Sequence, residues 1–307
     1  RKSKKIKFIK GVYMKKHAYL IIAHNDFEIL ENLIILLDDM RNDIYIHIDV
    51  KVKKFDFEYF RSLVKKSRIE IFKKINVLWG GTTQIDVELF LLEHASKNQY
   101  DYYHLLSGVD LPLKSQDYIH QFFDKNNGKE FINFDECVRN IVIEKRVKYY
   151  YFFVGGYRSQ NLFYRYFTKI FNRISRTVQN ILGISKIDEG YVYRKGSQWF
   201  SITHSLAKYV LDQRENIKRN YRYSFCCDEV FLQTIVYNSP FFAMVKRIDE
   251  KYNNALRYID WEHGNPYVFK SSDFNNLIKS KALFARKFNV ENIDVVKKIT
   301  QHILNEL

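Results

Sequence analysis

Apolar residues in the first 125 positions alternate between short strand-like runs and stretches with helical spacing. Strands are expected at residues 17–23, 44–49, 69–72, 77–79 and 102–106. Between them, apolar side chains recur every three or four positions, which predicts helices over residues 26–39, 56–66, 83–97 and 115–123. Repeated strand–helix–strand units predict an α/β fold with a mostly parallel central sheet flanked by helices.

The pattern changes in the middle of the chain. Residues 158–182 predict one or two basic amphipathic helices, with an apolar face of Phe163, Tyr166, Phe167, Ile170, Phe171, Ile174 and Val178. Three interpretations are open: an ordinary helix with a solvated basic side, a helix on a membrane surface, or a partner-binding helix. Further on, residues 196–203 are strand-like, residues 230–236 are amphipathic, and residues 293–307 predict a terminal helix.

Composition narrows the class of protein. The chain has 46% apolar residues and a net charge of +15, so it is globular and strongly basic. A basic surface suits nucleic acid, a membrane or an anionic substrate, but no nucleic-acid module is recognisable and nucleic acid is not an expected partner. No apolar run reaches the roughly 18 residues that a membrane span needs. Three cysteines, Cys137, Cys226 and Cys227, favour a reducing compartment over a disulfide scaffold.

Polar residues and glycines follow the predicted strands. His24, Asp49, Gly80 and Asp110 each lie in a loop after a strand. Ligands of parallel sheets bind beyond the carboxyl ends of the strands, so these loops predict a small-molecule site. Neither of the glycine-rich phosphate-binding fingerprints follows the first strand.

An acidic pair, Asp228 and Glu229, precedes the amphipathic run 230–236. Such a pair is favoured at a helix start by the helix dipole, and it can be a simple cap. Alternatively, a carboxylate held in a cleft can take a proton from an alcohol.

Eight sequence blocks in order carry a resemblance to a known family. They are residues 17–24, 46–49, 79–81, 105–113, 196–200, 228–234, 256–261 and 283–288. Together they resemble the core-2/I-branching glycosyltransferase family, which also includes the peptide O-xylosyltransferases, over nearly the whole chain. The resemblance implies a GT-A-like fold and transfer of a sugar from a UDP donor with inversion.

The resemblance also implies roles for individual residues. Glu229 matches the catalytic base, and Arg286 with Lys287 matches the position that binds the UDP diphosphate. No Asp-x-Asp triplet stands at the expected strand end, so neither a metal nor another cofactor is expected. A second diphosphate-binding cation is expected, for which both Arg257 and Lys270 qualify.

The remaining site residues fall into two implied groups. Donor-binding positions are Ala23, His24, Asp49, Trp79, Gly80 and Asp110, and acceptor-side positions are Gln198, Trp199 and Asp228. For three of them a purely structural role stays open. His24 can be a capping residue, Asp49 can stabilise a turn, and Trp79 can fill part of the hydrophobic core. In the xylosyltransferase branch an acid occupies the Gln198 place, which argues against a xylosyltransferase.

The expected function is that of a UDP-sugar-dependent hexosyltransferase acting on a glycan or lipid-linked glycan. N-acetylglucosamine is the expected donor sugar, with xylose, glucose or galactose as alternatives. A bacterial cytoplasmic enzyme is expected, with peripheral contact to the inner membrane face through residues 158–182. The competing hypothesis is a non-catalytic carbohydrate- or nucleic-acid-binding protein.

The expected organisation is a single domain in four stretches. Residues 1–13 are an extension or vector-derived, and residues 14–135 form the UDP-sugar-binding half. Residues 136–190 form a basic aromatic helical insertion, and residues 191–307 form the acceptor-binding and catalytic half.

Overall fold

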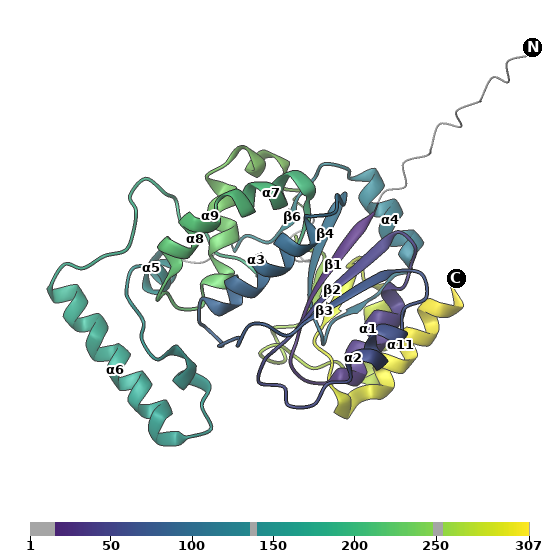
Figure 1. The fold of residues 1–307 in the computed structure, drawn as a ribbon, viewed down its shortest axis with the longest axis horizontal. Coiled ribbons are helices and arrows are strands. Elements are labelled where there is room, and N and C mark those ends of the chain that lie inside the picture. The colour runs from purple at the N-terminus through teal and green to yellow at the C-terminus, as the bar shows by residue number, and fades with distance from the viewer. Residues whose placement is uncertain (1–15, 136–139, 248–253, 307) are drawn as a thin grey trace, which may run out of the picture.

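The computed structural model describes residues 16–135, 140–247 and 254–306. The expected extension over residues 1–13 and Cys137 lie outside the described residues. In the first half, strands and helices alternate (Figure 1): β1 (His17–Ala23), α1 (Phe27–Leu37), β2 (Asn42–Ile48), α2 (Phe57–Ser62), β3 (Arg68–Phe72), α3 (Thr83–Ala95), β4 (Tyr102–Ser107) and α4 (Gln116–Lys125).

The second half contains shorter strands and more helix. Its helices are α5 (Asn140–Val147), α6 (Leu162–Ile181), α7 (His204–Asp212), α8 (Arg214–Tyr221), α9 (Phe231–Tyr237), α10 (Phe274–Lys279) and α11 (Ile293–Asn305). Its strands are β6 (Phe131–Ile132), β7 (Phe200–Thr203), β8 (Arg257–Ile259) and β9 (Phe284–Arg286), and β5 (Leu111–Pro112) precedes them. Single turns of 3₁₀ helix are η1 (Val154–Arg158), η2 (Cys227–Glu229), η3 (Pro240–Met244), η4 (Ser271–Asp273) and η5 (Val290–Asn292).

The central sheet has the strand order β3-β2-β1-β4-β7-β6. Strands β3, β2, β1 and β4 are parallel to one another, whereas β7 is antiparallel to β4 and to β6. The structure therefore confirms the predicted α/β fold with a mostly parallel central sheet flanked by helices. Because β7 joins the same sheet as β1, both halves of the chain contribute strands to one central sheet.

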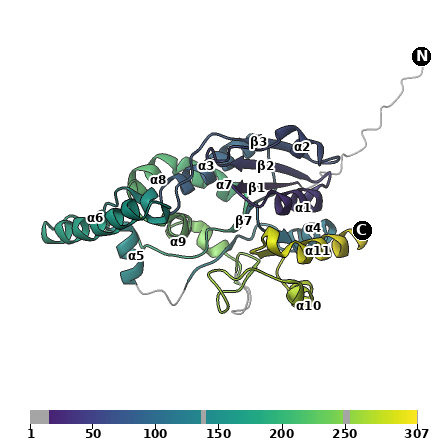
Figure 2. The ribbon, with the colours of Figure 1, turned by 90° about the horizontal axis from the view of Figure 1, so that it is seen from below.

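Alternate residues of β1 face the two layers that cover the sheet. Tyr19 and Ile21 belong to a core packed with α1 and α11, whereas Ala18 and Leu20 belong to a core packed with α3 and α7. Figure 2 shows α1 and α11 on one side of the sheet and α3 on the other. Both faces of β1 are buried, which is why the sequence shows it as a continuous apolar run.

A smaller sheet, with the order β5-β9-β8, is held to the central one by a buried arginine. Arg257 on β8 is 1% exposed. Its Nη2 donates to the carbonyl oxygens of Leu105 on β4 (2.9 Å) and Phe200 on β7 (2.8 Å). Its Nη1 donates to Ser201 Oγ at 2.9 Å and to the carbonyl oxygen of Ala255. One guanidinium therefore joins the two sheets.

The strand predicted at residues 77–79 is wrong. The backbone N–H of Val77 donates to Asp49 Oδ2 (3.2 Å) and that of Leu78 to Thr83 Oγ1 (2.8 Å). Side chains thus take the donors that a neighbouring strand would need, and the segment forms a loop.

The strand-like block 196–203 is a strand only from Phe200 onward. The backbone N–H of Gly196 instead donates to the carbonyl oxygen of Glu229. The acidic pair does not start an α-helix, because it lies in η2, separated from α9 by Val230, and Asp228 is buried.

Helix α6 projects from the body of the protein (Figure 1). It confirms that residues 158–182 contain a long helix, which begins at Leu162 with Asn161 as its cap. No helix in the described parts of the chain combines the length and apolar character needed to span a bilayer.

We predict that Arg257→Met lowers the free energy of unfolding by about 3 kcal/mol or more, because it leaves several buried carbonyl oxygens without a donor. Urea unfolding measures this loss. The matched variant Lys270→Met, at an exposed cation, is expected to change stability by less than about 0.5 kcal/mol. A stable Arg257→Met protein that has lost only nucleotide affinity would show that Arg257 is a ligand residue.

Candidate functional site

The loops after β1, β2 and β4 are tied to one another by backbone contacts. The N–H of Asp49 donates to the carbonyl oxygen of Ala23 at 3.0 Å. Gly108 packs so closely that a Cβ at this position would lie 2.6 Å from the Ala23 Cβ. The buried Asp49 carboxylate accepts from the N–H groups of Lys51 and Val77 and forms an ion pair with Lys51 Nζ at 3.3 Å. Asp49 therefore stabilises a turn, which was the alternative to a role in binding the sugar donor. This turn lies at the edge of the sheet where the sugar donor is expected to bind.

His24 lies at the same edge and beside Lys287. Although the ring is exposed, partial enclosure by its surroundings lowers its pKa below the ordinary value. Asp49 opposes this effect, whereas the cations Lys51 and Lys287 add to it. A neutral imidazole next to two lysines can accept or donate a hydrogen bond without opposing an anionic ligand.

Arg286 is oriented by two neighbours. Its Nε donates to Asp110 Oδ1 at 3.2 Å, and its guanidinium carbon lies 4.3 Å from the centre of the Trp199 ring. Asp110 is completely buried and also accepts from the backbone and hydroxyl of Ser107. Asp110 thus positions the arginine, and within the described residues no hydrogen bond occupies Arg286 Nη1 or Nη2.

Glu229 is fixed through one of its two oxygens. Its Oε2 lies 2.6 Å from Arg146 Nη1 and 3.4 Å from Lys195 Nζ, and Lys195 also contacts Asp135 at 2.6 Å. No bond to Glu229 Oε1 is recorded among the described residues, and the side chain is 35% exposed. The carboxylate therefore has a fixed orientation and one oxygen free to accept a proton.

A second, buried acid pair lies beneath Glu229. Asp228 Oδ2 accepts from Gln84 Nε2 at 2.9 Å, and Glu88 Oε1 accepts from Gln198 Nε2 at 3.4 Å. Burial, with a further contribution from Glu229, raises the pKa of Asp228 to about 7. Burial and then Asp228 raise the pKa of Glu88 well above its usual value. Gln198, expected on the acceptor side, thus contacts an acid of the core.

Trp79 and Gly80 lie beside η1 and Phe225. The Arg158 guanidinium carbon stacks 3.9 Å from the centre of the Trp79 ring, which is 40% exposed, so Trp79 is not core. Gly80 has φ +74°, and a Cβ there would lie 2.7 Å from the Phe225 ring. Its N–H donates to Gln84, the residue that also contacts Asp228.

The two candidates for the second cation differ in accessibility. Arg257 is buried between the sheets, and burial lowers its pKa to about 9. It cannot reach a ligand in this structure. Lys270 is exposed, and its neighbour Phe269 donates its backbone N–H to the carbonyl oxygen of Lys287 at 3.1 Å. Of the two, only Lys270 has an exposed side chain, and its segment is joined to Lys287 by this backbone hydrogen bond.

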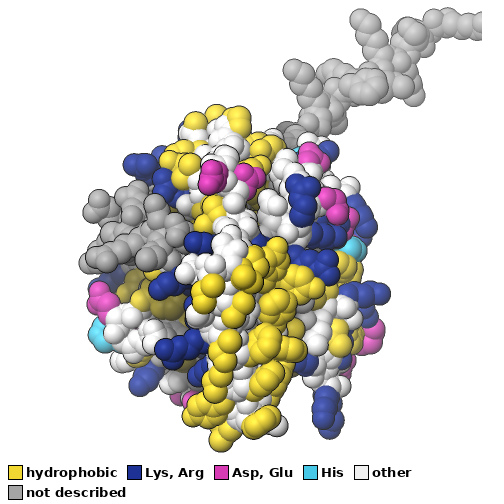
Figure 3. Space-filling view, turned by 90° about the vertical axis from the view of Figure 1, so that its left-hand side faces the viewer, with side chains coloured by type: hydrophobic (Ala, Val, Ile, Leu, Met, Phe, Trp, Pro, Cys, Tyr) yellow, Lys and Arg dark blue, Asp and Glu magenta, His cyan; other side chains and the backbone are white. Residues whose placement is uncertain are grey.

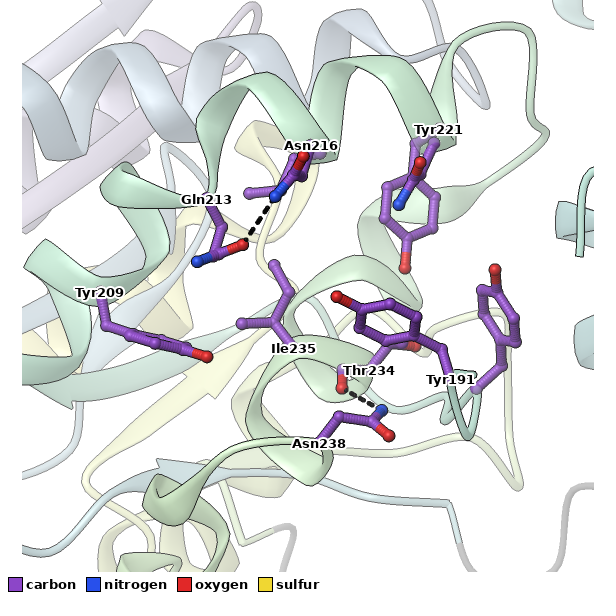
Figure 4. Close-up of a pocket in the computed structure, with 11 residues that line it drawn as sticks. Tyr191, Tyr209, Gln213, Asn216, Tyr221, Thr234, Ile235 and Asn238 are labelled. Atoms are coloured by element: carbon purple, nitrogen blue, oxygen red, sulfur yellow. Dashed lines mark hydrogen bonds between the residues drawn. The ribbon is translucent and has the colours of Figure 1, made fainter. Parts of the chain in front are cut away.

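A polar and aromatic pocket lies apart from these residues, among α7, α8, α9 and the loop before β7 (Figure 4). Its lining includes Tyr191, Tyr209, Gln213, Asn216, Tyr221, Thr234, Ile235 and Asn238. None of the residues predicted for donor, acceptor or catalysis lines it. This pocket is therefore separate from the predicted site.

Several of these contact residues were not predicted from the sequence. Glu88 could have been found, because it lies on the apolar side of α3 with Ile85, Leu89 and Leu92. No sequence pattern pointed to Arg146 or Lys195, since they come from segments that meet only in the fold.

Cys226 and Cys227 are buried free thiols, and burial raises the pKa of each to about 12. The described residues contain no group of three or more His, Cys, Asp or Glu side chains that could hold a metal ion.

The fold is that of an α/β protein. Its candidate site contains the cations Arg286 and Lys287 and the oriented carboxylate of Glu229, which are linked by contacts between buried residues. The particular family is given by comparison with known proteins. A model of the core-2/I-branching enzyme family matches residues 17–280, and the chain belongs to this family.

Curated relatives are similar over nearly all of this chain. Xylosyltransferase 2 of Rattus norvegicus is 24% identical over 315 residues, covering 93% of this chain and 33% of the relative. Xylosyltransferase 2 of Homo sapiens is 23% identical over 315 residues with the same coverage. The chain therefore spans about a third of the length of these relatives.

Solved structures show a weaker similarity. The apo-form glycosyltransferase GlyE in Streptococcus pneumoniae TIGR4 is 12% identical with a TM-score of 0.38, covering 95% of this chain and 63% of that chain. The apo form of mouse xyloside xylosyltransferase 1 is 10% identical with a TM-score of 0.37, covering 90% and 99%.

We predict that Asp228→Asn changes how stability depends on pH. The folded protein binds a proton at Asp228 more tightly than the unfolded chain does, so ionisation between about pH 4 and pH 7 costs wild-type stability. Asn cannot ionise and keeps an oxygen for Gln84. The stability of the variant relative to wild type should rise across this window by up to about 4 kcal/mol.

Urea unfolding at several pH values measures the difference between the two proteins. The control is Glu262→Gln, at an exposed carboxylate, for which a flat difference is expected. A flat difference for Asp228→Asn as well would show that Asp228 is ionised throughout.

Proposed function

We propose that this protein is a glycosyltransferase that moves a sugar from a UDP donor to a glycan hydroxyl, with inversion and without a metal. Glu229 acts as the general base, while Arg286 and Lys287 neutralise the departing diphosphate. Membership of the core-2/I-branching family supports the class of reaction. The observation that carries the proposal is the geometry of Glu229, held by Arg146 and Lys195 through Oε2 with Oε1 left available.

The acceptor hydroxyl gives its proton to Glu229 Oε1 as its oxygen bonds to the anomeric carbon. The bond from that carbon to the phosphate oxygen breaks, and its electron pair leaves with UDP. Attack from the face opposite UDP inverts the anomeric centre. A general base of this kind contributes a rate factor of roughly 10² to 10⁴.

The departing diphosphate needs positive charge and no proton. Arg286 is supported by Asp110 and Trp199, so its remaining N–H groups are preorganised for phosphate oxygens. Lys287 follows it directly and lies near His24 at the end of β1. Fixed cations in these positions stabilise developing negative charge without rearrangement during the reaction.

N-acetylglucosamine is the donor sugar we propose, with xylose as the second candidate because the similar curated proteins are xylosyltransferases. The acceptor we propose is a glycan or lipid-linked glycan. Enzyme-dependent UDP release from a panel of UDP-sugars distinguishes the two donors. Turnover of UDP-xylose alone would reject N-acetylglucosamine while leaving the reaction class intact.

We predict that Glu229→Gln lowers kcat by roughly two to four orders of magnitude, because the amide cannot accept the proton. UDP affinity should change little, since the amide of the variant retains an oxygen for Arg146. Steady-state UDP release and UDP titration measure the two quantities. The control is Glu215→Gln on the surface of α8, and normal turnover by Glu229→Gln would sink the assignment of the base.

We predict that UDP raises the melting temperature of the protein equally with and without EDTA. We also predict that Lys287→Ala weakens UDP binding by about ten-fold, because a charge-assisted contact is lost. Thermal shift at increasing UDP concentration measures both effects. Lys125→Ala, at an exposed lysine of α4, is the charge-matched control. A UDP-induced shift that disappears on chelation would contradict metal independence.

A further inference from the structure

Helix α6 turns its apolar side away from the protein. The outward side is an apolar stripe of exposed residues: Phe163, Tyr166, Phe167, Ile170, Phe171, Ile174, Val178 and Ile181. Phe163 is 83% exposed and Ile181 is 77% exposed. Figure 3 shows hydrophobic side chains gathered in a long band on the face of the molecule where α6 projects. An amphipathic helix of a globular protein normally buries this side.

The inward side of α6 is polar, and its contacts fix the helix in this orientation. Its buried residues are Thr168, Asn172 and Gln179. Asn172 accepts from the backbone N–H of Phe152 (2.8 Å) and donates to its carbonyl oxygen (2.7 Å). Gln179 makes the same two contacts with Tyr150, at 2.8 and 3.0 Å. Rotating the apolar stripe inward would break all four hydrogen bonds, so the outward orientation belongs to the fold.

The segment that these amides hold widens the apolar surface. The Phe153 ring lies 5.3 Å from the Phe171 ring and 5.6 Å from the Phe167 ring, and Phe152 lies 6.1 Å from Phe171. Phe152 and Phe153 are themselves 37% and 50% exposed. The stripe is thus one edge of a continuous apolar surface, and such a surface on a folded protein marks an interaction site.

The charge around this surface has a single sign. Residues 145–187 contain nine Lys or Arg residues and no Asp or Glu. Lys169 and Arg173 are exposed on α6, and on the helical wheel both border the same side of the stripe, next to Tyr166. No ion-pair partner is recorded for either side chain within the described residues. An apolar surface bordered by unpaired cations matches a layer that is anionic outside and apolar beneath.

We propose that the apolar stripe of α6, together with Phe152 and Phe153, seats this protein on the surface of an anionic lipid membrane. The rings and aliphatic side chains enter the boundary between headgroups and acyl chains, and Lys169 and Arg173 contact lipid phosphates. A second copy of the chain fits less well, because pairing two such faces would bring together basic segments that contain no acid. This inference is independent of the proposed glycosyl transfer.

Co-sedimentation of the full chain with lipid vesicles tests the proposal. We expect binding to phosphatidylcholine vesicles that contain about 30 mol% phosphatidylglycerol, weaker binding without the anionic lipid, and weaker binding at high salt. The variant Phe163→Gln/Ile170→Gln/Ile174→Gln should bind at least about ten-fold more weakly, because it removes three inserting side chains while keeping good helix formers.

Two matched controls separate the stripe from general surface chemistry. Met40→Gln/Tyr118→Gln/Val290→Gln removes three exposed apolar side chains elsewhere and should bind as wild type does. Lys169→Gln/Arg173→Gln should weaken binding on the order of ten-fold at low salt, whereas Lys65→Gln/Lys66→Gln, with the same loss of charge, should have little effect.

Three outcomes would overturn the proposal. The first is wild-type protein that stays in the supernatant with anionic vesicles. The second is unchanged vesicle binding by the stripe variant in a sample whose circular dichroism matches wild type. The third is a concentration-dependent dimer in light scattering that the stripe variant abolishes, without vesicle binding, which would identify a second copy of this chain as the occupant.

Discussion

One buried guanidinium determines how the two sheets meet. Arg257 lies on the small sheet, and its four hydrogen bonds reach β4, β7 and the chain before β8. Burial lowers its pKa to about 9, and Asp110 is the carboxylate that partly offsets this effect. The middle strand of the small sheet, β9, ends with Arg286, the residue expected to meet the diphosphate. The position of that arginine relative to the parallel strand ends therefore depends on a cation that is itself buried between the sheets.

The contacts made by Arg257 also connect Arg286 to the acidic residues around Glu229, through the residues at and before the start of β7. Phe200 and Ser201 accept from Arg257, and the preceding Trp199 stacks on Arg286. Gln198 contacts Glu88, whose charge is coupled to that of Asp228, the neighbour of Glu229. Buried contacts thus connect the cation and the carboxylate of the proposed site. A transferase that separates a proton acceptor from a diphosphate-binding cation benefits from such rigidity, because neither group can approach and neutralise the other.

Much of the fold follows from the sequence, and the exceptions have physical causes. β1, β2 and β4 are buried on both faces and are therefore mostly apolar, although β2 and β4 also bury His47 and His104, and this is why their positions were predicted closely. The segment 77–79 has a similar apolar pattern, but Thr83 captures one of its donors and Asp49, which is distant in sequence, captures another. The contact with Asp49 exists only in the fold, and no local rule contains that information. The site was predictable where a residue follows a strand or belongs to a family block. The partners of Glu229 were not, because Arg146 and Lys195 are brought to it only by the fold.

Helix α6 shows a different limit, since an amphipathic pattern predicts a helix without specifying which side faces the protein. Here two amides, Asn172 and Gln179, fix the orientation by pairing with the backbone groups of Phe152 and Tyr150. The segment they hold continues into η1, where Arg158 stacks on Trp79 beside the predicted donor site. The projecting helix and one wall of the site are therefore parts of one stretch of chain joined by only three residues. A surface that binds α6 is consequently held near Trp79.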